Sequence, residues 1–199
     1  KREIGDNAHV GLMALATNRL ESAGDYPVMA GFGPGKLRRP PQLCPTGDLV
    51  ASGERCFHDA YVAGIDGRWR SPSGDYVVSA QAIGSLIKSG PPRTLPDGTV
   101  IKSGDVGPGA QVQLAKEGGE HIVGNVLYEG YGRKLDYNDL GYMQRQNLHR
   151  FYGGVEYRTV KPWASTLETH TGIEYGERDN LDFLPQSRSL GPRRHGAHL

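Results

Sequence analysis

The sequence is poor in the features that mark an aliphatic core or a helical membrane protein. Hydrophobic residues make up 37% of the 199 positions, which is low for a core built from aliphatic side chains. The longest apolar run, Val10 to Ala16, is far shorter than the roughly 20 residues that a transmembrane helix needs. The sequence therefore predicts no membrane-spanning helix.

A surplus of charge of one sign is also missing. Lys and Arg total 23 and Asp and Glu total 22, so no basic excess steers the chain toward nucleic acid. We predict no nucleic-acid partner.

Catalytic and metal-binding motifs are absent as well. No G-x-S-x-G elbow occurs, and the histidines lack the H-E-x-x-H spacing of a zinc site. His58 lies beside Asp59, but Ser79 or Ser85 would complete a triad only if the fold brought them together. We predict no enzyme activity, no metal and no cofactor.

A loop at Asp136, Asn138 and Asp139 carries oxygen ligands that admit two interpretations. They could hold calcium, but the spacing lacks the glycine and terminal glutamate of an EF-hand. Asn and Asp side chains also form turns, and we favour that use.

A glycine-rich piece at 31–35 precedes no helix, so it does not predict a phosphate-binding loop. The basic residues that follow, Lys36, Arg38 and Arg39, would suit lipopolysaccharide phosphates or form a solvated loop cluster.

Only two cysteines occur, Cys44 and Cys56, within one long loop-like segment. They offer neither the four ligands of a structural zinc site nor a C-x-x-C motif. A disulfide closing a small loop is favoured over two unpaired thiols, because the surrounding Gly and Pro residues indicate an exposed loop.

What the sequence does have is alternation of apolar and polar residues with a period of two. In residues 61–70, Ile65 and Trp69 share one face while Arg68 lies on the other. A compact turn at 71–74 leads to a similar strand at 75–85, and the two form a hairpin. Further alternating strands follow at 110–114, 121–131, 148–160 and 165–177, and another precedes them at 9–17.

The connections between these strands differ in length at the two ends of the sheet. Short turns near Ser71, Lys116 and Lys161 alternate with long segments at 18–57, 88–107 and 132–147. Transmembrane barrels have brief turns on one rim and long loops on the other. We predict an all-β, antiparallel up-and-down meander forming a partial transmembrane β-barrel over residues 1–184, with a disordered tail at 185–199. A soluble β-sandwich is the alternative.

The barrel prediction assigns positions to two groups of side chains. An aqueous interior would be lined by polar residues from the charged faces of the strands. These lumen-facing residues are Asp66, Arg68, Arg70, Gln81, Asn125, Glu129, Arg150, Glu156, Arg158, Glu168 and Glu174. Aromatic residues near strand ends would form an interfacial girdle. The girdle residues are Tyr61, Trp69, Tyr76, Tyr131, Trp163 and Tyr175.

Several segments resemble an uncharacterised outer-membrane β-barrel domain that follows a family-nine-like carbohydrate-binding domain in larger bacterial proteins. They are VGLMALAT at 10–17, VAGIDGRWR at 62–70, YVVSAQAIGS at 76–85 and YNDLGYMQ at 137–144, continuing into the strand that begins at Leu148. The resemblance implies an outer-membrane location and a polysaccharide-related context, and no established reaction.

Taken together, the sequence predicts a non-enzymatic anchor or conduit in the outer membrane of a Gram-negative bacterium. Its partners would be membrane lipid, glycans or lipopolysaccharide, and further strands of a parent chain. About seven strands are fewer than the even number of at least 8 that bacterial barrels use, and residues 1–7 lack the features of a signal peptide. We therefore expect an internal piece. The alternatives are a soluble β-rich carbohydrate-binding module and, least favoured, a membrane-associated hydrolase.

Overall fold

The structure is a computed structural model that describes residues 1–22, 24–29, 40–141, 143, 145–159, 161 and 166–198. The side chains of residues 166, 167 and 193–198 lie outside this description.

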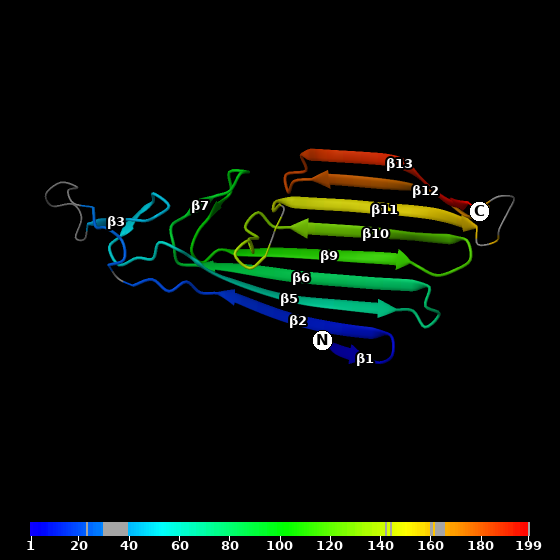
Figure 1. Ribbon diagram of the computed structural model, residues 1–199, viewed down its shortest axis with the longest axis horizontal. Helices are drawn as coiled ribbons and strands as arrows, with labels where there is room; N and C mark the ends of the chain where they lie inside the picture. The colour runs from blue at the N-terminus through cyan, green and yellow to red at the C-terminus, as the bar shows by residue number, and fades with distance from the viewer. Residues whose placement is uncertain are drawn as a thin grey trace.

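A single nine-stranded antiparallel sheet dominates the described part of the chain (Figure 1). Its order is β1-β2-β5-β6-β9-β10-β11-β12-β13, so each strand pairs with the next large strand along the sequence. The strands of this sheet are β1 (Arg2–Ile4), β2 (Ala8–Thr17), β5 (Asp59–Arg70), β6 (Tyr76–Lys88), β9 (Val106–Lys116), β10 (Ile122–Tyr131), β11 (Leu148–Thr159), β12 (Thr166–Asp179) and β13 (Pro185–His198). The all-β antiparallel meander is thus confirmed.

Two small hairpins interrupt the meander. β3 (Pro41–Leu43) pairs with β4 (Leu49–Ala51), and β7 (Arg93–Thr94) pairs with β8 (Val100–Ile101). Both belong to long connections at the same end of the sheet (Figure 1). That end, which we call the long rim, carries the segments at 18–58, 89–105 and 132–147, and the opposite short rim carries the turns at 71–75 and 117–121.

The prediction of a disordered tail at 185–199 was wrong for residues 185–198. These residues form β13, which pairs with β12 along most of its length. An edge strand is held by backbone hydrogen bonds, so its Arg, His and Gly residues need not alternate with apolar ones. Residues 185–198 instead pair with the backbone N–H and C=O groups of β12.

The register carries the two-faced pattern from strand to strand. Residues directly opposite each other in a ladder share a face. Ile65 pairs with Ala82, and Ala82 pairs with Ala110, on one face. On the other face a continuous polar row crosses five neighbouring strands, consisting of Asp66, Gln81, Gln111, Glu129 and Arg150.

The strands β1 and β13 are the edges of the sheet, and no ladder between them joins the described residues into a closed barrel. None of the described residues forms a helix long and apolar enough to cross a membrane.

Buried hydrophobic clusters lie at the long rim, not between two layers. One consists of Cys44, Val50 and Cys56. The other is built from Ala60, Ile87 and Ile101, at or near strand ends, with partly buried Leu95 and Leu140 packed against it. Within the described part of the chain, the centre of the sheet therefore has no conventional core on either side.

Candidate functional site

One face of the sheet exposes its large apolar side chains. Leu12 is 77% exposed and Leu114 is 52% exposed, although both lie within long strands. By the register, this apolar face displays Leu12, Ile65, Trp69, Tyr76, Val106, Val112, Leu114, Ile122, Val126, Tyr128, Phe151, Val155, Tyr157, Ile173, Tyr175 and Leu190. Contiguous exposed apolar surface of this kind marks a face that contacts something other than water.

The opposite face carries the charged side chains, and we call it the polar face. The ladders place all of the residues expected to be lumen-facing on this one face. They are Asp66, Arg68, Arg70, Gln81, Asn125, Glu129, Arg150, Glu156, Arg158, Glu168 and Glu174. Glu129 is only 8% exposed, so a carboxylate here is more buried than leucines on the apolar face.

Charged side chains on the polar face pair with residues of other strands and turns. The Glu129 carboxylate in β10 lies 2.6 Å from the Arg150 Nε in β11, and Arg70 at the end of β5 contacts Glu117, in the turn after β9, at 2.5 Å. The Tyr152 hydroxyl donates to Glu174 at 2.8 Å. Such cross-strand contacts let the face hold many charges with few unpaired ones.

The aromatic girdle is only partly as expected. Trp69 and Tyr76 lie beside the short rim on the apolar face, and Tyr61 lies on that face near the long rim. Tyr175 is on the apolar face but inside β12, away from its ends. Tyr131 was misplaced: it is two residues from Glu129 in β10, so it lies on the polar face. Trp163 is outside the described residues.

The connection between β10 and β11, residues 132–147, folds back over the polar face. Leu135 is completely buried, and the Asp136 amide donates to the Ser85 hydroxyl at 2.9 Å. A Cβ at Gly107 would lie 2.2 Å from the Leu135 Cα, so only glycine permits this close approach. Gly109 makes similar room for the Leu135 side chain.

The same segment also contacts residues beside the ends of β2 and β5, which are not neighbours of β10 or β11 in the sheet. The Asp139 carboxylate lies 2.5 Å from His58 Nε2 and 3.2 Å from the Arg19 guanidinium. Leu140 shares a cavity of about 280 Å³ with Met13 and Leu15, whose side chains lie on the polar face of β2. The segment thus spans the polar face from β10 to β2 beside the long rim.

Asp136 anchors the middle of this segment. It is fully buried, and its carboxylate pairs with the Arg93 guanidinium. Its other oxygen accepts hydrogen bonds from the Asn138 amide and side chain, each 3.1 Å long. The Asp136 and Asn138 side chains therefore build a turn, whereas Asp139, which we also expected to cap a turn, makes ion pairs with other segments.

The residues considered for a hydrolytic triad have other contacts. His58 pairs with Asp139, and Asp59 pairs with Arg55 at 2.5 Å. The Ser85 hydroxyl accepts the Asp136 amide and is 2% exposed. Each of these side chains therefore makes a structural contact at the long rim.

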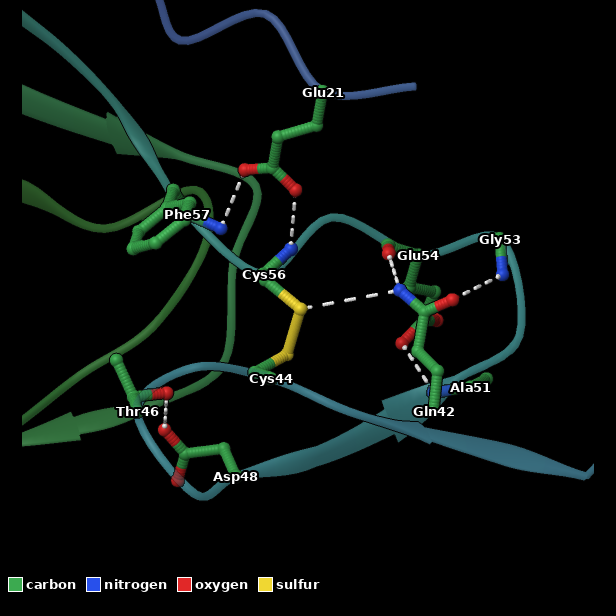
Figure 2. Close-up of a disulfide and its surroundings, with 10 residues drawn as sticks. All are labelled: Glu21, Gln42, Cys44, Thr46, Asp48, Ala51, Gly53, Glu54, Cys56 and Phe57. Atoms are coloured by element: carbon green, nitrogen blue, oxygen red, sulfur yellow. Dashed lines mark hydrogen bonds between the residues drawn. A yellow bond between two sulfur atoms is a disulfide. The ribbon is translucent and has the colours of Figure 1, made fainter. Parts of the chain in front are cut away.

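The long connection from β2 to β5 contains a disulfide between Cys44 and Cys56 (Figure 2). The Gln42 side chain lies beside it, donating to the Glu54 carbonyl at 2.6 Å and accepting from the Gly53 amide at 3.3 Å (Figure 2). The Glu21 carboxylate accepts the amides of Cys56 and Phe57 (Figure 2). These contacts tie the cross-linked loop to the chain leaving β2. The basic residues Lys36, Arg38 and Arg39 and the piece at 31–35 are outside the described residues.

A cavity of about 500 Å³ opens on the polar face at the long rim. Its floor comes from β10, β11 and β12, and the segment 132–147 supplies one wall. Its lining consists of Glu129, Tyr131, Tyr137, Met143, Arg145, Leu148, Arg150 and Arg178. Sequence patterns identified Glu129 and Arg150 as polar-face residues, but nothing local signalled that Tyr137 and Arg145 would fold back beside them.

Comparison with protein families gives a match to Domain of unknown function (DUF5916) over residues 50–184. The chain belongs to the DUF5916 family. The match runs from β4 through β12, so the DUF5916 region includes the cavity and the segment 132–147. It leaves β1, β2, β3 and β13 outside. No curated protein and no solved structure matches the chain.

Proposed function

We propose that the sheet is part of a membrane-spanning β-barrel of the bacterial outer-membrane type, acting as an anchor or conduit. The observation that carries this is the inverted burial of the two faces. Leu114 is 52% exposed on one face, while Glu129 is 8% exposed on the other. Outer-membrane strands turn apolar residues to lipid and polar residues to the interior, which this arrangement suits.

The lengths of the long strands support the same proposal. β5, β6, β9, β10 and β11 contain 10 to 13 residues each, enough to cross a bilayer at the tilt of a barrel strand.

The ion pair between Glu177 and Arg188 lies on the apolar face, but within a few residues of the long rim. Charges at that depth would meet headgroups and not hydrocarbon.

The proposed context is a polysaccharide-related protein of the outer membrane of a Gram-negative bacterium, as the resemblance of residues 10–17, 62–70, 76–85 and 137–144 implies. The edges β1 and β13 would pair with further strands, because unpaired backbone groups are costly in lipid.

A soluble β-rich carbohydrate-binding module is the second candidate. The cavity at the long rim favours it, since Tyr131 and Tyr137 line the cavity together with charged groups. The membrane-associated hydrolase is least favoured, because His58, Asp59 and Ser85 are engaged in separate structural contacts.

The test is to fractionate cells expressing the full-length gene product and to run the membrane fraction on a gel with and without boiling. We expect the protein in the outer-membrane fraction, with a folded species that changes mobility on heating. A protein that stays soluble and monodisperse without detergent would reject the barrel and support the soluble binding module.

A further inference from the structure

The cavity at the long rim contains more cationic than anionic side chains. Arg145, Arg150 and Arg178 line it, whereas Glu129 is the one carboxylate among its described lining residues. Arg150 and Arg178 are directly opposite each other in the β11–β12 ladder. Like charges at such positions destabilise a sheet unless an anion lies between or beside them.

Only part of this positive charge is neutralised within the described residues. Glu129 pairs with Arg150 at 2.6 Å. No ion pair to Arg145 or Arg178 occurs in the described part of the chain, and the buried Arg178 Nε has no hydrogen-bond partner there. A buried guanidinium donor without a partner is costly, so an acceptor from outside the chain would relieve that cost.

The other residues that line the cavity indicate what kind of ligand could carry that acceptor. Tyr131 and Tyr137 contribute phenols, while Met143 and Leu148 add buried apolar surface. Burial and the nearby Glu129 carboxylate raise the pKa of Tyr137, so its phenol stays protonated and can donate. The site thus offers mostly donors, one carboxylate acceptor and a small apolar wall. Its volume of about 500 Å³ lies within the roughly 300–1,000 Å³ of small-molecule sites.

We propose that this cavity binds an acidic saccharide, with the sugar carboxylate held by Arg145 and Arg178. Arg forks recognise planar carboxylates by paired hydrogen bonds. Glu129 would accept a sugar hydroxyl, and Met143 and Leu148 would contact the apolar face of a sugar ring. The site lies on the polar face and does not depend on what covers the apolar face.

Titration calorimetry with trigalacturonate tests the proposal on the full-length gene product. We expect binding of trigalacturonate and none of the neutral galactose trimer. Arg178→Gln and Arg145→Gln should each weaken binding by about tenfold or more, as loss of a charge-assisted hydrogen bond implies. The matched control is Arg133→Gln, which removes an exposed arginine outside the cavity that pairs with Asp182, and it should bind like the unaltered chain.

Circular dichroism of each variant establishes that the sheet is retained. Failure of trigalacturonate to bind, equal binding of the neutral trimer, or unchanged binding in both cavity variants would overturn the proposal. Displacement by equimolar inorganic sulfate would also overturn it, because the site would then recognise an oxyanion without the sugar. None of these results bears on the gel shift that tests membrane placement, so the two proposals fail separately.

Discussion

The two faces of the sheet differ in how their side chains meet their surroundings. The apolar face leaves Leu12 77% exposed and bears no covering segment among the described residues, whereas the polar face is partly roofed by residues 132–147. On the polar face, buried groups such as Glu129 and Asp136 are paired with arginines. Over the middle of the sheet, burial therefore follows from ion pairs and the folded-back segment, whereas the buried hydrophobic clusters lie at the long rim.

The largest difference between the two faces is expected when a charge is placed on each face of one strand in turn. Val112→Arg, on the apolar face near the middle of β9, should lower the free energy of unfolding in lipid by about 2–4 kcal/mol, the cost of Arg near a bilayer midplane. The matched variant, Gln113→Arg, lies on the polar face and should cost little. Denaturant titration of both variants in lipid vesicles measures the difference. Equal effects would remove the distinction between the faces.

A smaller effect is expected from adding a methyl group to one face at a time. Gly107→Ala puts a Cβ 2.2 Å from the Leu135 backbone and should cost about 1–3 kcal/mol by overpacking. The neighbouring strand offers a control in Gly84→Ala, where a Cβ on the apolar face meets nothing within 4 Å. Limited proteolysis should cleave residues 132–147 faster in Gly107→Ala alone. Identical cleavage of both variants would contradict the close approach.

The smallest expected effect is on pH dependence at the long rim. A hydrogen bond from Lys134, 2.6 Å away, holds the pKa of the Asp105 carboxyl below its ordinary value of 3.8. The stability from this pair is therefore complete above that value and is lost as the pH falls through the lower folded pKa. The opening of residues 132–147, measured as hydrogen exchange relative to the intrinsic rate at each pH, should rise at acid pH while the central strands stay protected. Lys134→Met should abolish this acid-dependent rise.

The faces of the sheet could be predicted from the sequence because strand periodicity fixes them. Ile65 and Asp66 are adjacent, so one must face each way, and the ladders preserve that choice across the sheet. The error at Tyr131 came from using nearness to a strand end and ignoring its alternation with Glu129. β13 was missed because an edge strand needs backbone partners and not apolar side chains.

The cavity could not be predicted because it depends on a contact between distant parts of the chain. Tyr137 and Arg145 belong to a connection whose sequence resembles an ordinary polar loop. The sequence feature that indicates this contact lies on another strand, where Gly107 and Gly109 both belong to the polar face and leave space for Leu135. Glycines spaced two apart in a strand indicate the close approach of another backbone.

The hydrogen bond from the Thr17 hydroxyl to the Asp139 carbonyl joins residues 122 positions apart, whereas β9 and β10 meet across a short turn. Hairpins of this kind form by local closure, and contacts of large sequence separation follow later because closing a long loop costs more entropy. Residues 132–147 can settle only after β2, β5, β6, β9 and β10 are already side by side. Docking of this segment is therefore a late event in folding, and the time at which it becomes protected reports completion of these five strands.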